Sequence, residues 1–126
     1  MGLRTPLGRV RGLGAAGEGT GHWWAQRLTA VALVPLSFVF VFLVILFKGA
    51  SHADVVVTMA NPLIAVILLL FIVAGFYHLK LGIQVVVEDY VHHEGVKTAI
   101  LVANAFGCIV LGTACIFAVL KLAFAG

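Results

Sequence analysis

Three long runs of apolar residues dominate the chain, at residues 28–47, 63–87 and 98–120. Each run reaches the roughly 20 residues that an α-helix needs to cross about 30 Å of hydrocarbon. The first and third runs hold no Asp, Glu, Lys or Arg, and the second holds only Lys80. This pattern predicts three transmembrane helices joined by short polar segments.

The polar segments set the boundaries of these helices. Residues 1–21 are rich in Gly and Arg and hold few large apolar groups, a composition typical of an extended tail that is ordered only by docking. We therefore divide the chain into a cytoplasmic N-terminal tail, residues 1–21, and a three-helix membrane domain, residues 22–126. We expect residues 48–62 to form an external connector, with Asn61 and Pro62 as the cap and first turn of the second helix.

The composition excludes a soluble globular domain. Of 126 residues, 63% are hydrophobic and only 10% are charged, whereas about a quarter of the residues in a typical soluble domain are charged. The fold class that we expect is an all-α membrane protein. A net charge of +3 is compatible with nucleic acid binding, but the basic residues are scattered beside the predicted helices. Anionic lipid headgroups explain them better, so we expect membrane lipid and no nucleic acid as a partner.

The basic residues also predict an orientation. Arg4, Arg9, Arg11 and Arg27 precede the first helix and Lys97 lies in the second loop, whereas Lys48 and Lys121 lie on the other side. By the positive-inside rule, the N-terminus and the second loop face the cytoplasm, or the matrix of an organelle. Three spans then put the C-terminus on the opposite side. For a bacterial chain, we expect a multi-pass protein of the cytoplasmic (inner) membrane whose C-terminus is periplasmic.

The third run contains small residues at regular intervals. Ala99, Ala103 and Gly107 recur every four residues, a spacing that predicts a helix-packing seam. Cys108 and Cys115 lie about 10 Å apart along the same helix, too far for a disulfide. We expect both cysteines to be thiols that pack as small apolar residues.

The most informative polar residue is His78, inside the second run. An ionisable side chain in hydrocarbon costs several kcal/mol unless it has a partner, so it indicates a functional site. Asp89 follows eleven residues later, within about 20° of the same helix face and roughly 16 Å further along the axis. Gly75 and Gly82 flank His78 on its own side of the helix and leave room for a neighbouring helix or a flat cofactor.

Three roles are open for His78: a proton relay, a hydrogen-bonded structural group, or a metal ligand. A relay usually needs further acidic or histidine residues along the membrane path, and the spans hold none between His78 and the outer surface. Zinc needs three or four ligands, and the nearest candidates, at residues 92–94, lie about three or more turns away. Haem needs one axial imidazole per helix. Haem therefore fits best, with its second ligand on another chain.

Polar residues also gather at the ends of the predicted helices. Asp89 and Tyr90 close the second run, where Tyr90 is either an ordinary interfacial tyrosine or a hydrogen-bond donor to a quinone carbonyl, oriented by the adjacent carboxylate. Trp23 and Trp24 stand where the first helix enters the headgroup region. Arg27 either snorkels outward or points into the bundle.

Two separated motifs carry a family resemblance. The segment HLKLGIQVVVEDY, residues 78–90, resembles the second-helix motif of the hydrophobic membrane-anchor subunit of succinate dehydrogenase, the succinate:quinone oxidoreductase. The upstream segment HWWAQRLTAVALVPL, residues 22–36, and the tail GRVRGLG, residues 8–14, are similar to the same subunit. With the length and the three spans, the resemblance covers nearly the whole chain.

The resemblance implies a partner and a shared cofactor. In that family the anchor packs with a three-helix cytochrome b subunit into a haem-binding helical bundle, and each chain gives one histidine to one haem b. His78 would be the axial ligand to the haem iron from this chain, and Tyr90, beside Asp89, would donate a hydrogen bond to ubiquinone. Arg27, in the family's R-x-T position, would lie near the haem propionates or the quinone pocket.

The resemblance also implies the role of the whole complex. A flavoprotein subunit would oxidise succinate, and an iron–sulfur subunit would pass the electrons to ubiquinone at the membrane. The chain would dock these soluble subunits and would not itself bind succinate. Two alternatives remain at this stage: the anchor of a fumarate reductase, and a structural or assembly subunit without a cofactor, in which His78 only forms a hydrogen bond between helices.

Overall fold

The computed structural model describes residues 5–11 and 16–125. Within these residues every regular element is a helix, which confirms the all-α fold class. The helices are α1 (Pro6–Arg11), α2 (Ala16–Leu46), α3 (His52–Met59), α4 (Pro62–Tyr90) and α5 (Glu94–Phe124).

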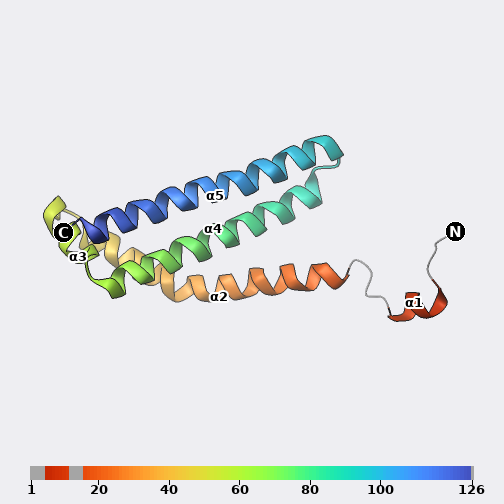
Figure 1. The fold of residues 1–126 in the computed structure, drawn as a ribbon, viewed down its shortest axis with the longest axis horizontal. Helices are drawn as coiled ribbons and strands as arrows, with labels where there is room; N and C mark the ends of the chain where they lie inside the picture. The colour runs from red at the N-terminus through yellow and green to blue at the C-terminus, as the bar shows by residue number, and fades with distance from the viewer. Residues whose placement is uncertain (1–4, 12–15, 126) are drawn as a thin grey trace.

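The three long helices lie side by side, and α4 is the central one (Figure 1). Helix α4 packs against both α2 and α5, while the short α3 packs against α5 and α4 at the end of the bundle near the C-terminus. The start of α2 and the turn between α4 and α5 lie together at the opposite end (Figure 1). The chain thus has the alternating course that three membrane crossings require.

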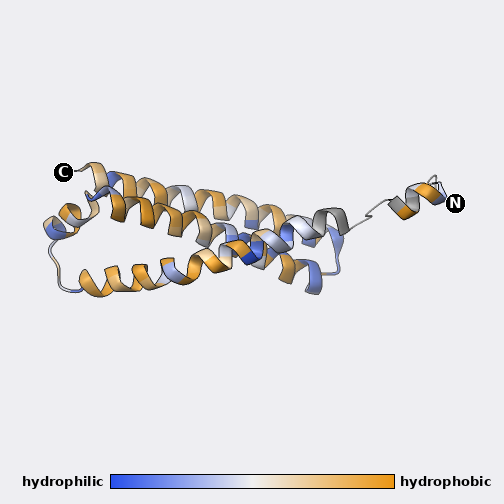
Figure 2. Cartoon of the chain, turned by 90° about the horizontal axis from the view of Figure 1, so that it is seen from below, coloured by the Kyte–Doolittle hydropathy of each residue, from blue (hydrophilic) through white to orange (hydrophobic). Residues whose placement is uncertain are grey.

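The long helices have the length and composition of membrane spans. The spanning segments Thr20–Leu46, Pro62–Tyr90 and Glu94–Phe124 contain the three predicted runs, and apolar residues follow them along most of their length (Figure 2). Most of their large apolar side chains are exposed, with exposed fractions of 75% for Phe38 and 66% for Phe117. Such surface is stable only against lipid or another protein, so the chain is a multi-pass membrane protein.

The N-terminal tail differs from the prediction. We expected extended backbone over residues 1–21, but Pro6–Arg11 form α1 and α2 begins at Ala16; residues 1–4 and 12–15 lie outside the described residues. Adding residues to an existing helix costs far less than starting a new one. The apolar run therefore extends its helix back through the segment before His22 despite the glycines there.

The connector between the first two spans contains a helix that we did not predict. Helix α3 begins with a capping box, in which the Ser51 hydroxyl accepts a hydrogen bond from the Asp54 backbone N–H at 3.2 Å and the Asp54 carboxylate accepts one from the Ser51 backbone N–H at 3.1 Å. The Ser51 hydroxyl also donates to this carboxylate at 2.7 Å. These hydrogen bonds, led by the hydroxyl, lower the pKa of Asp54. The Ser-x-x-Asp spacing was the overlooked signal.

The start of α4 agrees with the prediction. Asn61 is the N-cap and its side-chain oxygen accepts a hydrogen bond from the Leu63 N–H at 2.9 Å, while Pro62 is the first helical residue. Upstream, Gly49 lies in the turn that follows α2 and has a φ of 80°, a left-handed conformation that favours glycine. The two ends of the connector are thus set by local backbone chemistry.

The packing seam predicted on the third span is wrong for contacts within this chain. Ala99 and Ala103 are exposed, and a Cβ added at Gly107 would meet nothing within 4 Å. The close approach between α4 and α5 uses the buried Gly112 instead, where an added Cβ would lie 3.5 Å from the ring of Phe76. Spacing alone identified a small-residue stripe but not the face that turns toward α4.

Candidate cofactor-binding site

The two glycines beside His78 face helix α2. A Cβ built on Gly82 would lie 3.6 Å from Nε2 of Gln26, and one on Gly75 would lie 3.9 Å from Cδ2 of Leu33. Of the two occupants that the sequence left open for these gaps, the neighbouring helix is therefore the one present. The absence of side chains at both positions lets α2 approach α4 on either side of His78.

His78 itself contacts α2 between these two points. Its Nδ1 lies 3.0 Å from Oγ1 of Thr29. The same oxygen lies 2.7 Å from the backbone oxygen of Ala25 and 3.1 Å from that of Gln26, one turn earlier in α2. The imidazole is partly buried, and no hydrogen bond to its Nε2 occurs within the described parts of the chain. One ring nitrogen is therefore partnered within the chain and the other is available.

A pocket lined by both polar and apolar side chains opens one turn from His78 toward the end of the bundle that holds the α4–α5 turn. Its volume is about 700 Å³, within the usual range for ligand pockets. The residues that line it from α2 and α4 are His22, Trp23, Gln26, Arg27, Gly82, Gln84, Val85 and Glu88. Gly82 and Val85 follow His78 by four and seven residues, so the helix face of His78 continues into the pocket wall.

The α2 wall of the pocket carries a cation and an unused acceptor. The guanidinium of Arg27 lies 5.4 Å from the ring centroid of Trp23, a cation–π contact between residues four apart. The side-chain oxygen Oε1 of Gln26 is buried and has no hydrogen-bond partner. A buried acceptor without a partner is costly, so this wall suits a ligand, water or partner group that donates a hydrogen bond.

The acidic end of α4 divides between the pocket and the surface. Glu88 lines the pocket and its carboxylate accepts a hydrogen bond from Gln84 Nε2 at 2.8 Å. Asp89 is exposed, and Tyr90 has 77% of its surface exposed; neither lines the pocket. Of the predicted site residues, the structure therefore brings Arg27 to the pocket near His78 and leaves Asp89 and Tyr90 at the surface beside it.

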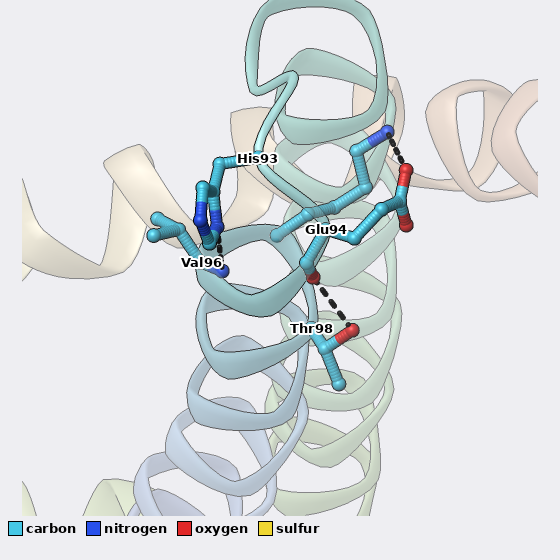
Figure 3. A network of polar contacts seen from close by, with 5 residues as sticks. His93, Glu94, Val96 and Thr98 are labelled. Carbon is cyan, nitrogen blue, oxygen red and sulfur yellow. Dashed lines mark hydrogen bonds and ion pairs between the residues drawn. The ribbon is translucent and has the colours of Figure 1, made fainter.

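The turn that follows Tyr90 is fixed by its own hydrogen bonds (Figure 3). Nδ1 of His93, the N-cap of α5, accepts from the Val96 N–H at 3.3 Å, and the Thr98 hydroxyl donates to the Glu94 carbonyl at 2.9 Å. Lys97 lies 3.8 Å from the Glu94 carboxylate. These contacts are local to α5 and hold the turn without using the end of α4.

The structure gives His78 no further protein ligands for a metal. Residues 5–11 and 16–125 contain no group of three or more His, Cys, Asp and Glu side chains placed to hold one ion. His92 and His93 lie in the turn, beyond the end of α4. Both cysteines are free.

Two residues of this region, Thr29 and Gln26, were not predicted from the sequence. Both are uncharged polar residues near the start of the first span, where each is easily satisfied by its own helix backbone or by headgroups. The available signal was the position of Thr29 two residues after Arg27, within the R-x-T motif that we assigned to Arg27 alone.

Comparison with known proteins adds independent information. The family of succinate dehydrogenase/fumarate reductase transmembrane subunits matches residues 1–122. The succinate dehydrogenase hydrophobic membrane anchor subunit of Paracoccus denitrificans is 34% identical over 110 residues, which is 87% of this chain and 85% of the relative. The corresponding subunit of Rickettsia bellii is 28% identical over 80% of this chain and 81% of its own length.

A further relative extends this pattern. The succinate dehydrogenase membrane anchor subunit of Reclinomonas americana is 31% identical over 67% of this chain and 71% of its own length. No solved structure matches the chain at a significant level. The likeness thus rests on sequence, and the family match over residues 1–122 includes the first two spans and nearly all of the third.

Proposed function

The chain belongs to the family of succinate dehydrogenase/fumarate reductase transmembrane subunits, and from this premise we propose that it supplies a haem ligand and part of the quinone site. Within a succinate dehydrogenase complex it is a membrane-anchor component rather than the succinate-oxidising subunit. We further propose that it docks a flavoprotein and an iron–sulfur subunit and pairs with a cytochrome b subunit. The names of its relatives favour succinate oxidation over fumarate reduction.

The observation that carries the haem proposal is the arrangement around His78. The imidazole has one nitrogen on Thr29 and the other available, and its helix face leads into a pocket with Arg27 in its wall. An imidazole nitrogen is a common axial ligand of haem iron, and a cation near the propionates pairs with their negative charge. The buried oxygen of Gln26, which lacks a partner, fits a site completed by a hydrogen-bond donor from a partner subunit or water, because an ionised propionate only accepts.

In this proposal His78 holds the haem iron through one nitrogen, and a residue of the cytochrome b subunit provides the second ligand. The cation–π contact with Trp23 orients Arg27, whose guanidinium would pair with the negative charge of a haem propionate or face the quinone. When bound, haem b would supply one-electron redox chemistry. The surrounding apolar surface would keep water from the site and so strengthen each of these charge interactions.

The quinone role falls to the end of α4. The Tyr90 phenol donates a hydrogen bond to a quinone carbonyl, and the carboxylate of Asp89 orients the phenol or relays protons. Both side chains are exposed in this chain. Residues that bind a substrate at the interface with other subunits must be exposed in the isolated chain. Glu88, on the pocket side, is a second carboxylate near the same helix end.

A spectrum of the purified complex tests this proposal. The affinity-tagged chain, isolated from its native membrane, is expected to carry flavoprotein and iron–sulfur subunits with it and to show a b-type haem band after reduction. A complex that oxidises succinate but shows no such band would support the anchor role and contradict the haem role. In that case the structural contact between Thr29 and His78 would be the whole function of the histidine.

A further inference from the structure

We infer that Thr29 is a positioning residue: its hydroxyl holds His78 as the tautomer protonated at Nδ1 and so leaves Nε2 as the metal-binding nitrogen. This inference rests on the proposed haem role of His78 and adds the residue that prepares the ligand. The sequence motif contains Thr29, but the contact becomes visible only when α2 and α4 are placed together.

The hydrogen-bond geometry around Thr29 sets the direction of the contact. A threonine hydroxyl has one proton to donate and two lone pairs that accept. Its oxygen lies 2.7 Å from the Ala25 carbonyl oxygen, which can only accept. The proton is therefore committed to Ala25, because two oxygens so close without a proton between them would repel each other. Toward His78 Nδ1, at 3.0 Å, the hydroxyl is then an acceptor.

The acceptor role of Thr29 determines the chemistry of the imidazole. A neutral imidazole carries one N–H, so a proton on Nδ1 leaves the Nε2 lone pair free. Metal-binding histidines usually donate their other N–H to an outer acceptor, which orients the ring and makes it a stronger ligand. Thr29 fills this outer position from within the same chain.

The contact belongs to a regular packing register and is not an isolated approach. Gln26 meets Gly82, Thr29 meets His78 and Leu33 meets Gly75. Along α2 these residues are three and then four positions apart. Along α4 their partners are four and then three positions apart in the reverse direction, as expected for antiparallel neighbours. The glycines on both sides allow the close approach that the hydrogen bond needs.

The register also links Thr29 to the pocket. Gln26 and Arg27, in the preceding turn of α2, line it, as do Gly82 and Val85 beyond His78 on α4. The same stretch of α2 thus carries Thr29, which accepts the hydrogen bond from His78, and the cation Arg27. A shift of α2 along α4 would misplace both, which makes the ligand tautomer and the cation position dependent on the same helix contact.

The test compares Thr29 variants in the purified complex. Thr29→Val deletes the hydroxyl and keeps the shape, whereas Thr29→Ser keeps the hydroxyl. Thr98→Val is the matched control, because Thr98 also donates to a carbonyl four residues earlier but touches no histidine. The readouts are haem content per flavin, the rate of haem loss to an apo-globin acceptor, and the reduction potential of the haem.

The expected result is specific to the hydroxyl. Thr29→Val should release haem about tenfold faster or more, the usual scale when the outer partner of a metal-binding histidine is removed. Its haem potential should rise, because a less electron-rich imidazole stabilises the oxidised iron less. Thr29→Ser and Thr98→Val should match the unmodified complex. Should Thr29→Val not assemble, Thr29→Ala makes the same deletion with a smaller side chain.

Other outcomes overturn the inference in distinguishable ways. Wild-type haem retention and potential in Thr29→Val would show that the hydroxyl does not prepare the ligand, while the haem role of His78 would stand. A serine variant altered as much as the valine variant would assign the effect to packing by the methyl group. A wild-type complex without haem would remove the proposed function and this inference together.

Discussion

The phenol of Tyr90 stands at the last residue of α4 with most of its surface exposed. Tyr90→Phe removes one hydroxyl and keeps the ring, so folding and haem content should be unchanged. A lost hydrogen bond costs about 0.5–1.5 kcal/mol, and more where the acceptor gains charge on reduction. Quinone reduction should fall roughly tenfold if the loss reaches about 1.4 kcal/mol. Succinate oxidation with a soluble electron acceptor should persist.

Tyr77→Phe is the matched control for this measurement, because Tyr77 is a partly exposed tyrosine of the same helix outside the proposed site. Both activities should remain at wild-type level in that variant. If Tyr90→Phe lowers both activities together, Tyr90 is structural. If it lowers neither, Tyr90 is only an interfacial anchor.

Single residues differ in how far the sequence alone identifies them. His78 and Arg27 are conspicuous because an ionisable group within or beside an apolar run is costly and rare. Thr29 is not conspicuous, since a threonine in a helix satisfies its own hydroxyl. Its role depends on the register between α2 and α4, which no local pattern specifies. The position of Glu88 in the pocket depends in the same way on where α2 lies.

Among the elements, the contact between α4 and α5 gives a sharp prediction at Gly112. A Cβ there would lie 3.5 Å from the Phe76 ring, an ordinary contact, whereas further atoms would enter the ring. Gly112→Leu should therefore destabilise the packing by about 1–3 kcal/mol, the usual cost of overfilling a packed interface. Gly112→Ala should be tolerated. The melting temperature of the solubilised complex measures both, and equal stability of the two variants would contradict this packing.

The hydrophobic pattern of the sequence predicts some of the helices and not others. The three spans were predictable because each is a long apolar run, and the cap of α4 was predictable from Asn61 and Pro62. Helix α3 was missed because a helix of eight residues is set by its capping box rather than by periodicity. The stripe at Ala99, Ala103 and Gly107 was assigned to packing by spacing, which does not tell which neighbour a face meets.

For the whole molecule, the basic residues together with the course of the three helices predict an orientation. The start of α2 and the α4–α5 turn lie at one end, and the C-terminus lies at the other (Figure 1). The basic residues of the tail and Lys97 predict that the first end is cytoplasmic. A reporter active only outside the cytoplasmic membrane should work when fused after Gly126 and fail when fused near His93. The reverse pattern would separate Tyr90 from the cytoplasmic side.

We propose that His78 binds haem within a complex that this chain anchors. The decisive measurement is the haem content per flavin of the purified His78→Ala complex, with His92→Ala as the control, because His92 is exposed and lies in the turn outside the membrane helices. We predict that His78→Ala loses most or all b-type absorbance while retaining part of its assembly, and that His92→Ala keeps both. Unchanged haem content and an unchanged spectrum in His78→Ala would contradict the account.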